Sequence, residues 1–182
     1  MPPSSPQAFL LVDGYNVIGI WSDLKKTRDR HGLEPARQEL VEALINYSAF
    51  QDYQTQVVFD AHFQNTPSSS EALTNHLSVC YTDFGQTADT YIEKFCAAFR
   101  YNISYPKQRL IVATSDRAQQ LTVVGYGAEW MSSLQLVSDV ELMARRAKRR
   151  QRPQKQSGSR FLFNSLDAQA QQRLAEWRRG IR

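Results

Sequence analysis

Three short apolar runs, each followed by an aspartate, constrain the fold of this chain more than any other feature of its sequence. The runs are AFLLV before Asp13, QVVF before Asp60 and RLIVATS before Asp116. Runs of Leu, Ile and Val without polar alternation are typical of parallel strands covered on both faces. A fourth acid, Asp89, lies in GQTADTYIEK, where a polar turn leads into a helical pattern. Because ligands of open α/β sheets bind beyond the carboxyl ends of the strands, these acids are predicted to meet in one place.

Such a gathering of acids has an energetic cost that narrows the chemistry. Two negative charges about 4 Å apart repel each other by roughly 4 kcal/mol at an effective dielectric constant near 20. Clustered carboxylates therefore either take up protons or hold a cation. Oxygen ligands without an accompanying Cys or His pattern suit Mg²⁺ or Mn²⁺ better than zinc. The pattern predicts metal-assisted phosphoryl transfer.

The order of elements along the chain predicts an α/β fold with a mainly parallel sheet and helices on both faces. Strands are expected at residues 8–12, 54–59, 77–81, 109–113 and 129–131. Helices are expected at about 35–50, 87–101 and 117–124, and from Ser132 or Ser133 into RRAKRR. The segments KKTRDRHG, at 25–32, and AHFQNTPSSSEAL, at 61–73, are predicted to be surface loops, the second beside the proposed site.

The length of 182 residues and the 42% of hydrophobic residues suit one domain with an appendage. The predicted parts are a loose arm at 1–7, a globular domain at 8–150, and a basic linker with a C-terminal amphipathic helix at 151–182. No apolar stretch in the sequence approaches the ~20 residues that span a bilayer. The opening MPPSSPQ has no basic residue of the kind that precedes a secretory signal. We therefore expect no membrane association.

The two cysteines, Cys80 and Cys96, form neither a CxxC motif nor a disulfide framework. Each is predicted to be a small buried side chain, in a protein of the reducing cytoplasm. The three histidines show no HExxH or paired spacing. Neither a zinc site nor a small-molecule cofactor is expected.

The net charge of +4 hides a strong asymmetry along the chain. Residues 1–144 contain 10 basic and 16 acidic residues, a net charge of −6, whereas residues 145–182 contain 12 and 2, a net charge of +10. An acidic body with a basic tail suits a polyanion that the tail delivers to bound metal. Nucleic acid is the expected partner.

Each acid also has a purely structural explanation. Asp13 with Gly14 is a common turn pair, Asp89 near a helix start favours the helix dipole, and Asp116 is a good N-cap. Capping does not require the acids to fall at the same end of several strands, whereas a metal site does. We therefore favour the metal site for the four acids taken together.

Four further residues near these acids have two interpretations each. Asn16 either orients Asp13 or a bound water, or forms a turn. Thr114 and Ser115 either donate their hydroxyls to a carboxylate or phosphate, or simply end the strand. Glu93, one helical turn after Asp89, is either an outer ligand or a residue that faces solvent.

A run of cations with no intervening acid begins at the predicted end of the globular domain. The run consists of Arg145, Arg146, Lys148, Arg149, Arg150, Arg152, Lys155 and Arg160. These cations repel each other and gain most from a phosphate backbone, so the first six are predicted to contact RNA. Tyr101 and Tyr105 either stack on bases or pack within the protein.

The motifs around the acids also match a known family. DGYN at 13–16, VVFDA at 57–61, TADTYIEK at 87–94 and ATSD at 113–116 together resemble the NYN family, a branch of the PIN-like nucleases. The resemblance covers about residues 8–150 and is strongest to the bacterial YacP-like members, which are ribosome-associated RNA endonucleases. The closing LDAQAQQRLAEWRRG is similar to the tail of that group.

This resemblance implies a three-layer α/β/α sandwich whose acids bind Mg²⁺ or Mn²⁺ and cut RNA. Carried over by motif, Asp13, Asp89 and Asp116 are the metal ligands, Asp60 is the fourth acid, and Asn16 accompanies Asp13. The implied partners are RNA, in particular mRNA on the ribosome, and the ribosome itself.

Three hypotheses for the function follow. The first is a metal-dependent endoribonuclease, and the second is a non-catalytic module of the same fold that binds RNA or the ribosome. The third is a phosphoaspartate enzyme or receiver. We rank it last, because the chain has Asp13-Gly14-Tyr15 where such a phosphatase has Asp-x-Asp, and we find no lysine after a late strand.

Overall fold

The computed structural model describes residues 6–61, 69–102 and 108–151. The chain divides into two compact units, Met1–Ala144 and Arg145–Arg182, and each is described by itself. Arg145–Gln151, the described part of the second unit, is the final portion of a helix. The predicted arm at 1–7, of which residues 1–5 are not described, and the predicted linker and final helix at 152–182 therefore stay predictions.

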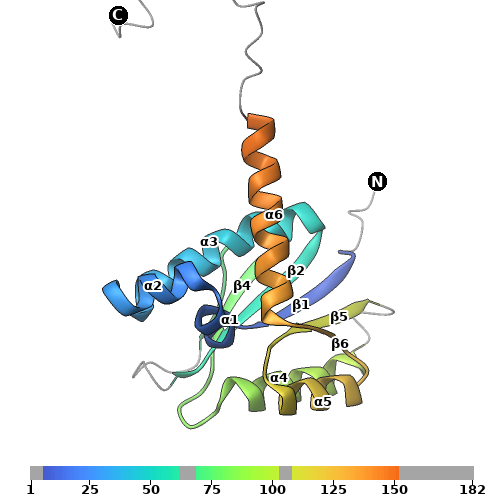
Figure 1. The fold of residues 1–182 in the computed structure, drawn as a ribbon. Coiled ribbons are helices and arrows are strands. Elements are labelled where there is room, and N and C mark those ends of the chain that lie inside the picture. Colours follow the sequence, from blue (N-terminus) through green and yellow to red (C-terminus); the bar gives the residue numbers. More distant parts are fainter. Residues whose placement is uncertain (1–5, 62–68, 103–107, 152–182) are drawn as a thin grey trace, which may run out of the picture. The chain divides into compact units, whose positions relative to one another are not determined.

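A six-stranded sheet forms the centre of the first unit, in the order β3-β4-β2-β1-β5-β6 (Figure 1). Neighbouring strands run parallel, except that β3 is antiparallel to β4. The strands are β1 (Ala8–Asp13), β2 (Tyr53–Phe59), β3 (Ser69–Ala72), β4 (Leu77–Tyr81), β5 (Arg109–Ala113) and β6 (Glu129–Met131). The predicted α/β fold with a mainly parallel sheet is confirmed.

Helices cover both faces of this sheet and complete three layers (Figure 1). The strands divide their side chains between the two faces, so that Leu10 and Val12 of β1 belong to one core and Phe9 and Leu11 to the other. One face is packed by α1 (Gly14–Ile20), α2 (Ser22–His31), α3 (Leu33–Gln51) and the first turns of α6 (Ser133–Gln151). The other is packed by α4 (Ala88–Phe99) and α5 (Arg117–Gly125).

Two segments that we expected to be loops contain regular structure. The charged segment 25–32 lies almost entirely in α2, because Lys and Arg are good helix formers and the single buried residue Leu24 attaches the helix to the core. Within 61–73, the polar residues Ser69–Ala72 form the exposed edge strand β3. An edge strand needs only backbone bonds to its neighbour, so its side chains carry little signal.

Two other expectations from the sequence can be compared with this architecture. Cys80 and Cys96 are buried and free, as predicted. In the part of the chain that the structure describes, we find no helix with the length and apolar character needed to cross a membrane.

Gly14 allows β1 to turn directly into α1 beneath the ring of Phe59. A Cβ atom at Gly14 would lie 2.3 Å from Cε1 of Phe59, whereas one at Gly19 in the same helix would meet nothing within 4 Å. Gly14→Ala is therefore expected to lower the free energy of unfolding by about 1–3 kcal/mol through overpacking. The matched control Gly19→Ala should leave it unchanged or raise it by up to ~1 kcal/mol. Urea unfolding followed by tryptophan fluorescence measures both, and equal stability of the two variants would contradict this packing.

Candidate functional site

Three of the four predicted acids lie at the carboxyl ends of three adjacent strands. Asp13 is the last residue of β1, the strand between β2 and β5. Asp13 is level with Val58 of β2, and its neighbour Val12 is level with Ala113 of β5. Asp60 and Asp116 follow those strands by one and three residues. The parallel register therefore places these acids at one edge of the sheet.

The fourth acid, Asp89, reaches this edge from the first turn of α4. The backbone N–H of Ala88, the residue before it, donates a short hydrogen bond to Oδ1 of Asp60. This bond joins the start of α4 to the end of β2. We call Asp13, Asp60, Asp89 and Asp116 the acid cluster.

Two of the acids also cap helices, as predicted for Asp116, whereas for Asp13 only a turn with Gly14 was expected. Oδ1 of Asp13 accepts from the Asn16 N–H at 3.2 Å and caps α1, and Oδ1 of Asp116 accepts from the Gln119 N–H at 3.0 Å and caps α5. Each cap occupies one oxygen of a carboxylate that has two. Capping explains where each acid sits locally, but not why the caps of separate helices lie at the same edge of the sheet.

The acids influence one another electrostatically. Asp13 is only 8% exposed, and its pKa is raised from 3.8 to about 7, mainly by burial. The negative charges of Asp89, Asp60 and Asp116 contribute to this rise, while the hydrogen bond from Asn16 opposes it. The pKa of Asp89 is also raised, first by burial and then by Asp116 and Asp60. Among the described residues, none of the ion pairs involves an acid of the cluster.

The carboxylates of the acid cluster are not arranged around one common point. Within the described ranges, no three side chains of His, Cys, Asp or Glu are placed to hold one metal ion. Instead, the carboxylates of Asp60, Asp89 and Asp116 each accept a hydrogen bond from a nearby N–H group. Chemically the set suits a hard divalent cation, because it offers oxygen ligands and carries uncompensated negative charge around a buried carboxyl. The metal ligands therefore stay a prediction.

For Asn16 the sequence left two roles open, and its hydrogen bonds show how the residue is placed. Its backbone N–H, rather than its side-chain amide, bonds to Asp13. Its Oδ1 accepts from the Ser115 N–H at 2.8 Å and from the hydroxyl of Ser133 at 2.7 Å. Asn16 thus connects α1 to the loop after β5 and to the start of α6. Ser133 is fully buried, and its role could not be seen in the sequence beyond its position at a helix start.

The predicted supporting residues are divided by the structure. Oγ1 of the buried Thr114 accepts from the Asp116 N–H at 3.1 Å, so it orients the loop that carries this acid. Oγ of Ser115 accepts from the Ser133 N–H at 3.1 Å. Glu93 is exposed and accepts from the hydroxyl of Tyr126 at 3.3 Å. Both Thr114 and Ser115 thus contribute to the edge, whereas Glu93 lines a small exposed pocket between α4 and α5 together with Asp89 and Gln119.

Gln119 belongs to the site, although sequence reasoning missed it. Its Nε2 donates to Oδ1 of Asp89 at 2.7 Å and its backbone N–H bonds to Asp116, so it connects two acids from different helices. The side chain is 6% exposed, and Oε1 is buried without a partner among the described residues. The spacing Asp116-x-x-Gln119 is that of a capping box and was the available signal.

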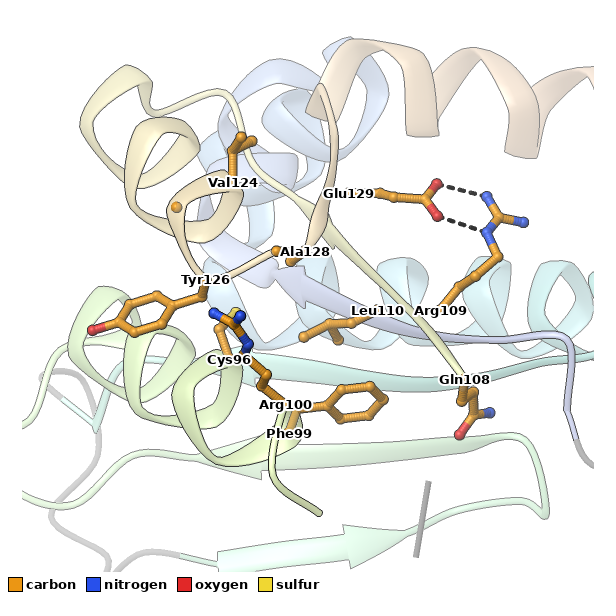
Figure 2. A pocket seen from close by; sticks show the side chains of 12 residues that line it. Cys96, Phe99, Arg100, Gln108, Arg109, Leu110, Val124, Tyr126, Ala128 and Glu129 are labelled. Carbon is orange, nitrogen blue, oxygen red and sulfur yellow. Dashed lines mark hydrogen bonds and ion pairs between the residues drawn. The ribbon is translucent and has the colours of Figure 1, made fainter. Parts of the chain in front are cut away.

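A cavity of about 620 Å³ lies away from this edge (Figure 2). Its lining comes from the end of α4, the start of β5, the end of α5 and the start of β6, and includes Phe99, Arg100 and Tyr126. At its rim, Arg109 donates two hydrogen bonds to the carboxylate of Glu129, at 2.7 and 2.6 Å. The cavity is therefore at the amino ends of the strands and contains no acid of the cluster.

Comparison with known proteins agrees with the four motifs. A family model described as the YacP-like NYN domain matches residues 10–179. The chain belongs to this family. YacP of Bacillus subtilis strain 168 is 35% identical to this YacP-like NYN protein over 175 residues, which cover 94% of the chain and 96% of YacP.

Two crystal structures of Rae1 (YacP) from Bacillus subtilis share the fold. One, of a variant with a single substitution, is 30% identical with a TM-score of 0.65, and covers 92% of this chain and 98% of its own. The other is 33% identical with a TM-score of 0.64, and covers 94% and 95%. The predicted resemblance is confirmed, and the YacP-like NYN domain has a nuclease-like fold.

The raised pKa of Asp13 predicts how stability depends on pH. In the unfolded chain this carboxyl loses its proton near pH 3.8, whereas in the folded protein it keeps the proton up to about pH 7. The folded state therefore binds more protons between these values, and the free energy of unfolding falls as the pH rises through them. Asp13→Asn, which keeps an acceptor for Asn16, should remove this dependence. At pH 8 the substitution should stabilise the protein by a few kcal/mol, because each unit by which the pKa is raised corresponds to about 1.4 kcal/mol.

The measurement is urea unfolding at pH 4, where the two proteins should be similar, and at pH 8, without divalent cations. The control Asp23→Asn removes an exposed acid that pairs with Lys26 at 3.1 Å, and should change stability by less than about 1 kcal/mol. If Asp13→Asn were no more stable than the original protein at pH 8, the charged carboxylate of Asp13 would not destabilise the folded protein.

Proposed function

We propose that this YacP-like NYN protein is a metal-dependent endoribonuclease that uses Mg²⁺ or Mn²⁺. The observation that carries the proposal is the buried carboxyl of Asp13, whose pKa is raised to about 7 by burial and by three further acids. A structural cap needs no other carboxylates around it, whereas a hard divalent cation is held by several oxygen ligands. The family, with its nuclease-like fold, supports the same reaction class.

In this proposal Asp13, Asp89 and Asp116 hold the metal, and Asp60 is the fourth acid. Bound Mg²⁺ or Mn²⁺ would supply positive charge for the scissile phosphate and lower the pKa of a water molecule. Gln119 orients the carboxylate of Asp89, and Asn16 keeps β1 and the loop after β5 in register. Hydrolysis of this kind is expected to leave a 5′-phosphate and a 3′-hydroxyl.

The proposed substrate is RNA. The first unit corresponds to the acidic part of the chain. In the last part of α6, four of the predicted RNA contacts are exposed: Arg145, Arg146, Lys148 and Arg149. The side chain of Arg150 and all of Arg152 lie outside the described residues. From the family resemblance we extend the proposal to mRNA on the ribosome, with the ribosome as a binding partner and the cytoplasm as the location.

Cleavage by variants of the acid cluster tests the reaction. Asp13→Asn and Asp89→Asn are each expected to lower RNA cleavage in Mg²⁺ or Mn²⁺ by about 100-fold or more, since each removes a charged ligand. The assay uses a labelled single-stranded RNA and, separately, translating ribosomes. The matched control Asp23→Asn lies on the exposed face of α2 and should cleave like the original protein. Unchanged cleavage by both cluster variants would overturn the proposed site.

A binding measurement separates the nuclease from the alternative RNA- or ribosome-binding module. Mn²⁺ should raise the unfolding temperature of the original protein in the absence of RNA, and should raise it less for Asp13→Asn, because only the folded site binds the ion. A protein that binds RNA, cleaves no RNA substrate, and keeps the same unfolding temperature when Mg²⁺ or Mn²⁺ is added would be the non-catalytic module.

The basic end of α6 is predicted to bind phosphates without reading sequence. Replacing Arg145, Arg146, Lys148 and Arg149 by Gln should weaken RNA binding. It should also flatten the plot of log affinity against log salt by about 0.7 per lost phosphate contact. Titrations of single-stranded RNA at several salt concentrations, in the Asp13→Asn background, measure both effects.

The matched control removes four positive charges from α2 instead. It replaces Lys25, Lys26, Arg28 and Arg30 by Gln. If both fourfold variants changed the salt dependence equally, net charge rather than the end of α6 would account for RNA binding.

A further inference from the structure

Phe84 is an exposed aromatic side chain in the turn that leads into α4, the helix that carries Asp89. It is 87% exposed, the highest value among the large hydrophobic side chains of the described residues. It lies in the turn of residues 82–87, between β4 and α4. Single exposed hydrophobic residues are common and need no explanation by themselves. What distinguishes Phe84 is how this turn is built and where it is attached.

Hydrogen bonds define the shape of the turn. Thr82 is 1% exposed, and its hydroxyl donates to the carbonyl of Gln86 at 2.6 Å. The Gln86 N–H donates to the carbonyl of Asp83 at 2.9 Å. Gly85 has a φ of 84°, which a residue with a side chain adopts only with strain. Phe84 is thus exposed on a turn with internal bonds, where the backbone presents the ring to solvent.

Both ends of the turn are attached to the segment that carries Asp60. The Thr82 N–H donates to the carbonyl of Phe59 at 3.0 Å, and the Thr82 hydroxyl accepts from the Ala61 N–H at 3.0 Å. At the other end, Ala88 donates its N–H to Asp60 itself. Phe84 lies four positions before Ala88, so their Cα atoms are at most about 14 Å apart. Phe84 is therefore held within reach of a substrate bound at the acid cluster.

The chemistry of this position favours a nucleobase over other ligands. The ring has no polar group, so it offers a flat apolar face. The acid cluster, to which the turn is attached through Asp60, repels phosphates and other anions unless a cation neutralises its charge. A base in single-stranded nucleic acid has an uncovered π face that stacks on aromatic side chains regardless of its identity. Bases in an RNA duplex are already stacked and do not offer that face.

We propose that Phe84 stacks on an unpaired base of the substrate next to the cleaved phosphate, and thereby selects single-stranded RNA. This inference rests on the proposed nuclease function and names the form of RNA that the site accepts. Tyr101, for which the sequence left both stacking on bases and packing within the protein open, is 80% exposed but follows the far end of α4, about 18 Å of helix away from Asp89. Tyr101 therefore provides the matched control.

The test measures binding and cleavage of a short single-stranded RNA of mixed sequence. Phe84→Ala is expected to weaken binding in the Asp13→Asn background by about tenfold. In the cleaving protein it should lower kcat/KM by a similar factor. Phe84→Trp should retain both, Phe84→Leu should behave like Phe84→Ala, and Tyr101→Ala should bind and cleave like the original protein. Because the ring is exposed, none of these changes should alter stability, which urea unfolding checks.

A fluorescent base gives a direct measure of stacking. With 2-aminopurine next to the cleaved bond, binding to the Asp13→Asn protein should quench its fluorescence, and Phe84→Ala should restore it. Equal binding, cleavage and quenching by Phe84→Ala and the original protein would overturn the inference while leaving the nuclease proposal intact. So would equal performance of Phe84→Leu, or a defect seen only with ribosomes, which would point to a protein partner.

Failure of the proposed function has a different signature. If the original protein cleaved no RNA with either metal, the nuclease would be wrong whatever Phe84 does. Stacking would then stand only if 2-aminopurine were still quenched in a manner that depends on Phe84, and would fall with the nuclease if it were not.

Discussion

Burial of the Asp13 carboxyl at the end of the central strand is the constraint on which the site depends. β1 lies between β2 and β5, so its last residue is surrounded by the ends of both neighbours. A buried carboxylate is costly unless something compensates its charge, and here the charges that act on its pKa are those of three more carboxylates. The protein alone offsets this cost with a backbone N–H and by holding the proton. A hard cation would offset it more completely, which is why the edge suits metal chemistry.

The surrounding bonds keep that arrangement in place. Asn16 connects the start of α1 to the loop after β5 and to α6, while Gln119 connects α5 to the acid of α4. Asp60 connects β2 to α4. Hydrogen bonds therefore connect elements that are distant in sequence at the edge that holds the acids. The turn with Phe84 is bonded to the same edge and is exposed to solvent. The large cavity at the amino ends has no such connections to the acid cluster, so its volume says nothing about the reaction.

Much of the fold could be predicted from the sequence, because apolar runs and helix signals are local. The strands β1, β2, β4, β5 and β6 and the helices α4 and α5 were predicted within a few residues. Two segments were wrongly predicted to be loops, and the reasons are physical. α2 is held by one buried leucine within a charged sequence, and β3 pairs through its backbone alone. The site residues Gln119 and Ser133 were missed because their partners lie 30 and 117 residues away.

The sequence by itself determined that acids end several buried strands, since strand formation and the position of an aspartate after it are both read along the chain. It also determined the family, through four motifs in order. Only the tertiary structure decided that Asp13 is the buried member, because burial depends on which strands flank β1. The same is true of the side-chain partners: Asn16 bonds to Ser115 and Ser133, and Gln119 to Asp89, because parallel pairing brings remote loops to one edge. Local pattern thus decides which residues can meet, and packing decides which of them do.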